Sequence, residues 1–269
     1  MGFGLLALAS LASGDCATVR AAPNEWRRVV LVELFTSEGC SSCPAADAFV
    51  RELPALGFGR DKVVPLTFHV DYWDRLGWKD RFAGPDFTAR QEWYARSTKL
   101  RSPDGEAGLH GLYTPQLVID GAVHLSGRRR QEAIHEIERA GAQPPLFELK
   151  PVATARGSIM DVTIEAIARP NVKKDLDWRV VVALTLRSAQ TPVTHGENAG
   201  ETLDEAAIAR VLSERVSMPA GPGEMARVRL TKPADAAWSD LDVVVFAQAE
   251  DTGAVDAAVQ LAARSPSSR

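Results

Sequence analysis

Two cysteines, Cys40 and Cys43, are the residues whose type and spacing most directly indicate chemistry. They follow an apolar run at residues 29–35, which is rich in β-branched side chains and predicts a strand buried on both faces. A short turn containing Gly39 leads from this run into a predicted helix that opens with the cysteines. Positions three apart on a helix share one face within disulfide reach, and a helix N-terminus lowers the pKa of a thiol. The sequence therefore predicts a redox-active pair in which Cys40 attacks a substrate and Cys43 resolves the mixed disulfide.

Three other interpretations of the cysteine pair stay open. An inert structural disulfide would close so short a loop that it gains little loop-closure entropy. A soft cation such as Cu(I) is a second possibility, with both thiolates and His69 as ligands. In the third, the pair has no chemical role and the C-terminal half of the chain binds a partner.

Glu33 is the one charged residue in the apolar run. An ionised carboxylate is costly to bury unless it is partnered or neutral. We predict that Glu33 is a buried proton acceptor beneath the cysteines that assists Cys43. The alternative is a structural glutamate near the strand end, bonded to a neighbour.

Thr114 and Pro115 stand directly before a short apolar run at residues 116–120, which predicts another strand. Bonds preceding proline are the ones often found in the cis form, and a proline is allowed at the start of a strand. We predict a cis bond packed against Cys40, with Thr114, Pro115 and Tyr113 shaping a groove for a substrate peptide. A trans turn proline is the alternative.

Aromatic and polar residues follow the second predicted strand, at residues 62–69. Trp73 belongs to an aromatic group that would form either a wall beside the disulfide for substrate or a cover over the core. His69, Asp71 and Asp74 lie where such sheets face their ligands, but we favour a structural, hydrogen-bonded histidine. We assign no metal site and no cofactor.

The predicted elements follow the order βαβαββα over residues 26–142, which indicates a mixed sheet with helices on both faces. Residues 143–145, Gln-Pro-Pro, interrupt this pattern and indicate a domain junction. Short strands separated by turn residues then predict an all-β, sandwich-like domain over residues 143–264, and residues 265–269 are a tail.

Composition limits the function classes. The 269 residues have a net charge of −4, which does not favour a nucleic-acid partner. An apolar run at residues 3–13 is too short to span a bilayer and is typical of a secretory signal, although no basic residue precedes Arg20. We therefore predict an export segment at residues 1–25, a periplasmic or otherwise exported protein, and no membrane span in the mature chain.

Three motifs together carry a family resemblance. The strand, the Cys-Ser-Ser-Cys sequence and residues 113–121 (Tyr-Thr-Pro-Gln-Leu-Val-Ile-Asp-Gly) resemble the thioredoxin superfamily, and the last of these is similar to the cis-proline strand of glutaredoxins. More narrowly, residues 33–44, 69–73 and 196–200 resemble an exported bacterial family known as domain of unknown function 1223. The resemblance covers about residues 29–262.

This resemblance implies a thioredoxin-like α/β fold and an envelope location, but it supplies no substrate. Together with the cysteine chemistry, it predicts an exported thiol–disulfide oxidoreductase that acts on a protein or a small thiol or disulfide. The alternative is a non-catalytic module of the cell envelope that handles copper or binds a protein.

Overall fold

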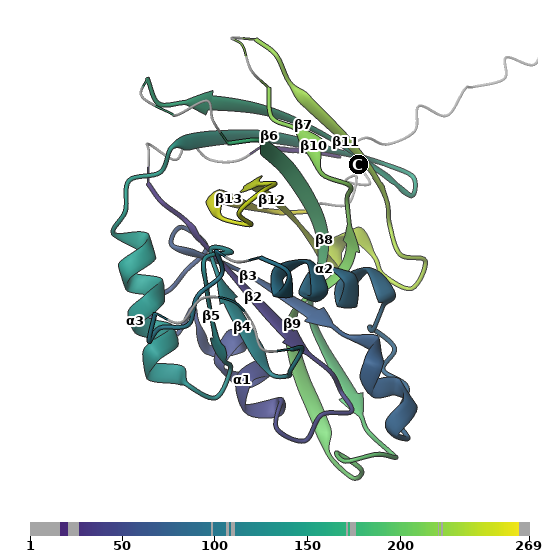
Figure 1. Ribbon diagram of the computed structural model, residues 1–269. Coiled ribbons are helices and arrows are strands. Elements are labelled where there is room, and N and C mark those ends of the chain that lie inside the picture. Colours follow the sequence, from purple (N-terminus) through teal and green to yellow (C-terminus); the bar gives the residue numbers. More distant parts are fainter. Residues whose placement is uncertain are drawn as a thin grey trace, which may run out of the picture.

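Two β-sheets and three α-helices make up the described part of the chain in this computed structural model (Figure 1). The structure describes residues 17–20, 27–97, 99–105, 108, 111–170, 172, 176–219, 221 and 223–263. The larger sheet is mixed and has nine strands, and the smaller sheet is antiparallel and has four. Strands thus outnumber helices strongly in this molecule.

The N-terminal half follows the predicted order of elements. In chain order these are β2 (Val30–Thr36), α1 (Pro44–Glu52), β3 (Val63–His69), the 3-10 helix η1 (Asp71–Leu76), α2 (Pro85–Ala95), β4 (Gln116–Ile119), β5 (Val123–Ser126) and α3 (Arg130–Gly141). β3 is parallel to β2, whereas β4 is antiparallel to it. The ends of β2 and β3 that lead to the cysteines and to η1 therefore lie side by side.

β2 is buried on both faces, as its apolar run predicts. Val30, Val32 and Leu34 pack with the apolar sides of α1 and α3. Leu31 and Phe35 point the other way, into a core shared with α2 and with strands from the C-terminal half. Helices therefore cover both faces of this part of the sheet (Figure 1).

The C-terminal strands are divided between the two sheets. The larger sheet has the order β13-β12-β8-β9-β3-β2-β4-β5, so four late strands extend it beyond β3. They are β8 (Trp178–Pro192), β9 (Thr202–Leu212), β12 (Leu241–Ala249) and β13 (Val255–Ala262). β10 (Val216–Ser217) pairs with β8 off this path.

The smaller sheet packs over the extension of the larger one (Figure 1). It consists of β1 (Ala17–Arg20), β6 (Phe147–Arg156), β7 (Ile159–Ala168) and β11 (Ala226–Thr231), and the 3-10 helix η2 (Trp238–Asp240) lies between β11 and β12. Only some strands of the predicted sandwich therefore form a separate sheet, and the others extend the larger sheet. Strand periodicity shows which residues face a core, but it does not show which strand pairs with which.

The terminal predictions lie largely outside the described residues. Of the predicted export segment, the structure describes residues 17–20, which form β1 and pair with β6. The predicted tail at residues 265–269 also lies outside the described part. Among the residues that are described, no helix has the length and apolar character that a bilayer-crossing segment needs.

Candidate active site

Cys40 and Cys43 form a disulfide in the turn between β2 and α1. The backbone N–H of Cys43 donates to the Cys40 carbonyl at 3.1 Å, and Cys43 is the N-cap of α1, with Pro44 in the first turn of the helix. The regular helix thus begins one turn later than predicted. Both cysteines have 0% exposed surface. The disulfide is therefore positioned at a helix N-terminus but is covered in this conformation.

Thr114 and Pro115 reach the disulfide from the segment that precedes β4. The Thr114–Pro115 peptide bond is cis, which confirms the prediction. The Thr114 hydroxyl donates to Cys40 Sγ at 3.3 Å, and Trp73 Nε1 donates to the same hydroxyl oxygen at 2.9 Å. Residues distant in sequence thus meet at Cys40. Ser42 Oγ also lies 3.4 Å from Cys40 Sγ.

The Tyr113 side chain contacts β5. Its hydroxyl lies 3.1 Å from His124 Nδ1, and its backbone carbonyl accepts a hydrogen bond from Gln91. Burial raises the pKa of Tyr113 to about 12. These contacts place Tyr113 as a support for the segment that carries Thr114.

Glu33 is on the wrong face of β2 for the predicted role. Its carboxylate accepts hydrogen bonds from Arg90 Nε at 2.6 Å and from the Tyr94 hydroxyl at 2.5 Å, both on α2. Side chains alternate along a strand, so an odd-numbered residue of β2 faces α2 while the cysteines lead into α1 on the opposite face. The prediction that Glu33 lies beneath the cysteines is therefore wrong.

Asp47 is the carboxylate on the cysteine side of the sheet. It lies four residues after Cys43, on the same face of α1, and its backbone N–H donates to the Cys43 carbonyl. Asp47 accepts a hydrogen bond from Thr36 Oγ1 at 3.1 Å, and burial raises its pKa to about 7. Its spacing from Cys43 is the sequence signal that could have identified it.

His69 is buried between two other carboxyl groups. Its Nδ1 lies 2.7 Å from Asp80 Oδ2, and its Nε2 lies 3.7 Å from Glu205 Oε1 on β9. Burial opposes the charged imidazolium, but Asp80 and the carboxyl groups around it raise the pKa of His69 to about 9. Burial also raises the pKa of Glu205, to about 8, whereas His69 overcomes burial and holds the pKa of Asp80 below its usual value. The favoured interpretation of His69 as a hydrogen-bonded structural residue agrees with this geometry.

The same cluster connects to the disulfide turn through Glu38. The Glu38 backbone N–H donates to Asp80 Oδ2 at 2.8 Å, and Trp78 Nε1 donates to the Glu38 carboxylate at 2.7 Å. Asp74 accepts a hydrogen bond from the Asp80 backbone N–H, whereas Asp71 accepts one from the Thr88 hydroxyl. Within the described residues, no three His, Cys, Asp or Glu side chains are grouped in a way that would hold a metal ion.

The loop between β8 and β9 touches the disulfide turn from the other side. Asn198 Nδ2 donates to the carbonyls of Glu38 and Cys40 at 2.9 and 3.1 Å. Glu197 accepts hydrogen bonds from the backbone and the hydroxyl of Ser41. Ser41 and Glu197 are 156 positions apart in the sequence. The 196–200 motif alone therefore does not predict a contact with the cysteine turn.

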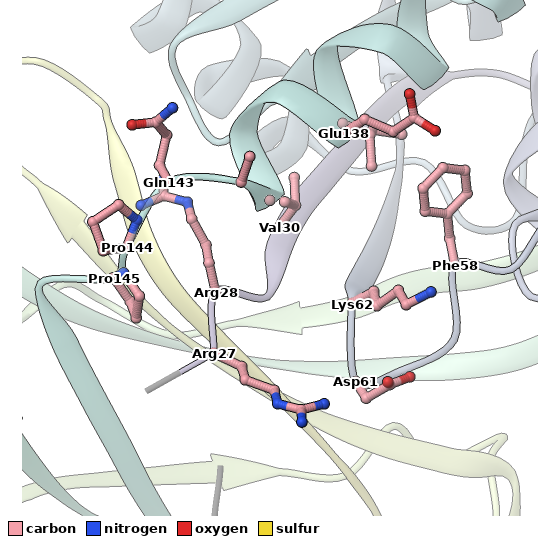
Figure 2. Close-up of a pocket in the computed structure, with 13 residues that line it drawn as sticks. Arg27, Arg28, Val30, Phe58, Asp61, Lys62, Glu138, Gln143, Pro144 and Pro145 are labelled. Carbon is pink, nitrogen blue, oxygen red and sulfur yellow. The ribbon is translucent and has the colours of Figure 1, made fainter. Parts of the chain in front are cut away.

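A separate hollow of about 630 Å³ opens at the start of β2, the end away from the cysteines (Figure 2). Its lining mixes both charge signs, with Arg28 and Lys62 facing the same space as Glu138. Arg28 already pairs with Asp120 and Asp256 at 2.7 and 3.1 Å. We therefore place the candidate active site at the disulfide.

Comparison with known families supports one assignment. The model of a family of proteins of unknown function, DUF1223, matches residues 31–248. The chain belongs to the DUF1223 family. This confirms the family predicted from the three motifs. The matched range includes both cysteines, Thr114 and the loop residues Glu197 and Asn198.

Two solved structures resemble this DUF1223 protein. A crystal structure of a protein from Agrobacterium tumefaciens has a TM-score of 0.64 at 26% sequence identity, over 90% of this chain and 98% of that one. HBP35 of Porphyromonas gingivalis has a TM-score of 0.66 at 11% identity, over 91% of this chain and 79% of that one. The second likeness concerns the fold alone. No curated protein matches the sequence significantly.

Proposed function

We propose that this DUF1223 protein is a thiol–disulfide oxidoreductase with a thioredoxin-like unit at residues 26–142. The observation that carries the proposal is the contact of Thr114 Oγ1 with Cys40 Sγ at a strand-to-helix turn. The βαβαββα order and the helices on both faces of β2 support the thioredoxin-like unit.

Exchange would begin at Cys40 in the reduced protein. The Cys40 thiolate attacks one sulfur of a substrate disulfide, a mixed disulfide forms, and the second substrate sulfur leaves as a thiolate that takes up a proton. The Cys43 thiolate then attacks Cys40 Sγ, which restores the Cys40–Cys43 bond and releases the other substrate thiol. Two electrons pass to the substrate, and the reverse sequence oxidises a dithiol.

Two features favour Cys40 as the attacking residue. The Thr114 hydroxyl donates to its sulfur, and such a donor stabilises the thiolate over the thiol. Ser42 Oγ lies 3.4 Å from the same sulfur, where its hydroxyl can donate a second hydrogen bond to a thiolate.

Asp47 takes the role first assigned to Glu33. Its pKa of about 7 lets it exchange a proton near neutral pH, and it stands on the α1 face that Cys43 shares. In this proposal Asp47 accepts the Cys43 proton as Cys43 attacks Cys40, and returns it in the reverse reaction.

Cysteine variants test the function directly. With insulin as substrate, Cys40→Ser should abolish turnover, whereas Cys43→Ser should accumulate a mixed disulfide at Cys40 that mass spectrometry detects. Turnover by Cys40→Ser at the wild-type rate would overturn the proposal. The Asp47→Asn variant, which keeps the shape of the side chain, should slow turnover most near neutral pH.

We further propose an exported, envelope location, which the apolar run at residues 3–13 supports. Fractionation of a Gram-negative host that expresses the full chain should recover it outside the cytoplasm. Recovery of both the full chain and a variant lacking residues 1–25 in the cytoplasm would contradict this proposal.

A further inference from the structure

The Cys40–Cys43 disulfide is covered in this conformation, so a substrate sulfur cannot reach it directly. Neither cysteine has exposed surface, yet exchange requires an attacking sulfur to reach Cys40 Sγ. The Thr114 hydroxyl contacts the sulfur from one side, and Trp73 holds that hydroxyl in place through its own hydrogen bond. The loop between β8 and β9 holds the turn from the other side.

This access loop, residues 193–201, is tied off at its base by two backbone hydrogen bonds. Gly200 N–H donates to the Val193 carbonyl at 2.8 Å, and Val193 N–H donates to the Glu201 carbonyl at 2.9 Å. Between these bonds, Gly196 has a φ of +79° and a Cβ there would lie 3.0 Å from Trp78 Cβ. The glycine therefore lets the access loop approach Trp78 and reach the disulfide turn.

Asn198 is the residue that closes the access loop on the turn. The residue is 6% exposed, and its side-chain amide donates to two carbonyls of the turn, including that of Cys40. A buried amide replaced by a methyl group leaves both carbonyls without these partners. Loss of Asn198 should therefore release the access loop from the turn.

Glu197 places a negative charge beside the same turn. Its carboxylate accepts from Ser41 N at 3.1 Å and from Ser41 Oγ at 2.7 Å, one residue after Cys40. Both hydrogen bonds lower the pKa of Glu197, so it is ionised at neutral pH. A fixed charge at this position repels an incoming molecule that carries extra negative charge.

We propose that the access loop determines which thiols reach Cys40: Asn198 closes the turn to all small thiols, and Glu197 adds a selection against anionic ones. This inference rests on the proposed function and defines its substrate class as polypeptides able to displace the access loop. In the relevant step, an attacking thiolate bonds to Cys40 Sγ, the Cys40–Cys43 bond breaks, and Cys43 leaves as a thiolate. A second thiol completes the two-electron reduction.

The test measures how fast the oxidised full-length protein loses its disulfide, by alkylation and mass spectrometry. The reagents are dithiothreitol, cysteamine, which carries an ammonium group, and glutathione, which carries net negative charge. Asn198→Ala should accelerate all three about equally, by roughly tenfold or more, as expected from the loss of two buried hydrogen bonds. An unchanged rate in a folded Asn198→Ala variant would overturn the closing role.

Glu197→Gln keeps an oxygen that can accept from Ser41 but removes the charge. It should lower the preference for cysteamine over glutathione by about threefold to tenfold, and added salt should lower the same preference in the wild type. Glu201→Gln is the matched control, since it removes one exposed carboxylate from the same loop and should leave the ratio unchanged. An equal ratio in wild type and Glu197→Gln would overturn the charge selection.

If Asn198→Ala does not fold, hydrogen exchange on the wild type tests whether the access loop closes on the disulfide turn. The Ser41 amide should exchange faster than the amides of β2, because its partner Glu197 is exposed and must release it when the access loop opens. Protection of Ser41 equal to that of β2 would overturn the inference. The rates of disulfide reduction and of hydrogen exchange are measured without enzymatic turnover. A failure of the proposed function would therefore appear separately, as the absence of insulin reduction.

Discussion

Arg90 has a fully buried guanidinium group that contacts both halves of the chain. It pairs with Glu33 on β2 at 2.6 Å and bonds to Gln248 on β12 at 3.2 Å. Its guanidinium carbon also lies 5.2–5.5 Å from the ring centroids of Phe68, Tyr94 and Phe246. The Glu33 carboxylate therefore neutralises a cation in the core, and its role is structural.

Glu33→Gln should destabilise the protein by roughly 3–5 kcal/mol, because it leaves the Arg90 charge buried without its counterion. The double variant Glu33→Gln/Arg90→Met should recover much of this loss, since it removes both charges. Urea unfolding of the oxidised proteins measures both effects. The reduction potential of the disulfide should stay at the wild-type value, and a large shift in the folded single variant would contradict the structural role.

Local sequence identified the disulfide-bonded pair but not all of the residues that contact it. The Cys-x-x-Cys spacing and the X-Pro bond are local signals, so sequence alone predicts the pairing of Cys40 with Cys43 and the cis bond before Pro115. Glu33 was misplaced because the register between β2 and the cysteine turn decides its face, and the turn length alone does not give that register. Asn198 contacts Cys40 across more than 150 residues, and such a contact requires the folded chain.

β9 is the element that links the C-terminal half to the site. It runs beside β3, where Thr67 Oγ1 donates to the Ala206 carbonyl at 2.8 Å, and it contributes Glu205 to the buried cluster. Thr191, at the end of β8, donates to Glu205 Oε2 at 3.2 Å. The access loop thus starts and ends on strands that pack against ionisable groups.

The free energy of unfolding should decrease as the pH rises from about 5 to 9. Asp47, His69 and Glu205 have folded-state pKa values raised to about 7, 9 and 8, so the folded protein binds more protons than the unfolded chain in this range. Each group's favourable contribution is therefore present at low pH and is lost as the pH passes its folded-state pKa.

Glu205→Gln mimics the protonated acid and should make this decrease shallower, with the largest gain over wild type above pH 8. Chemical denaturation at a series of pH values measures both curves. Glu201→Gln, an exposed carboxylate nearby in sequence, serves as the control and should leave the slope unchanged. Parallel curves for wild type and Glu205→Gln would show that Glu205 titrates normally.

The larger sheet makes one structural body of two regions that differ in sequence pattern. β12 and β13 supply Phe246, Val255 and Ala258 to the core behind β2, and β9 covers the edge of β3. The Gln-Pro-Pro break at residues 143–145 therefore separates sequence patterns, whereas the sheet continues across it. Periodicity predicted most individual strands, but pairing partners depend on contacts distant in sequence.

A fragment of residues 27–142 should fail to fold cooperatively by itself. Removing the C-terminal half exposes the core side of β2, uncovers the edge of β3 and deprives Arg28 of Asp256. Circular dichroism during heating and gel filtration would compare the fragment with the full chain. A monomeric fragment with a sharp thermal transition would show that residues 27–142 fold independently.

The buried Arg90 group has a consequence for the accuracy of assembly. Its partners come from β2, α2 and β12, so they converge only when strands from both ends of the chain occupy their correct places. A sheet joined with β12 shifted by one residue would turn Gln248 to the opposite face and leave one fewer partner for a cation among aromatic rings. We expect the buried Arg90 contacts to destabilise misassembled sheets more than they stabilise the correct one.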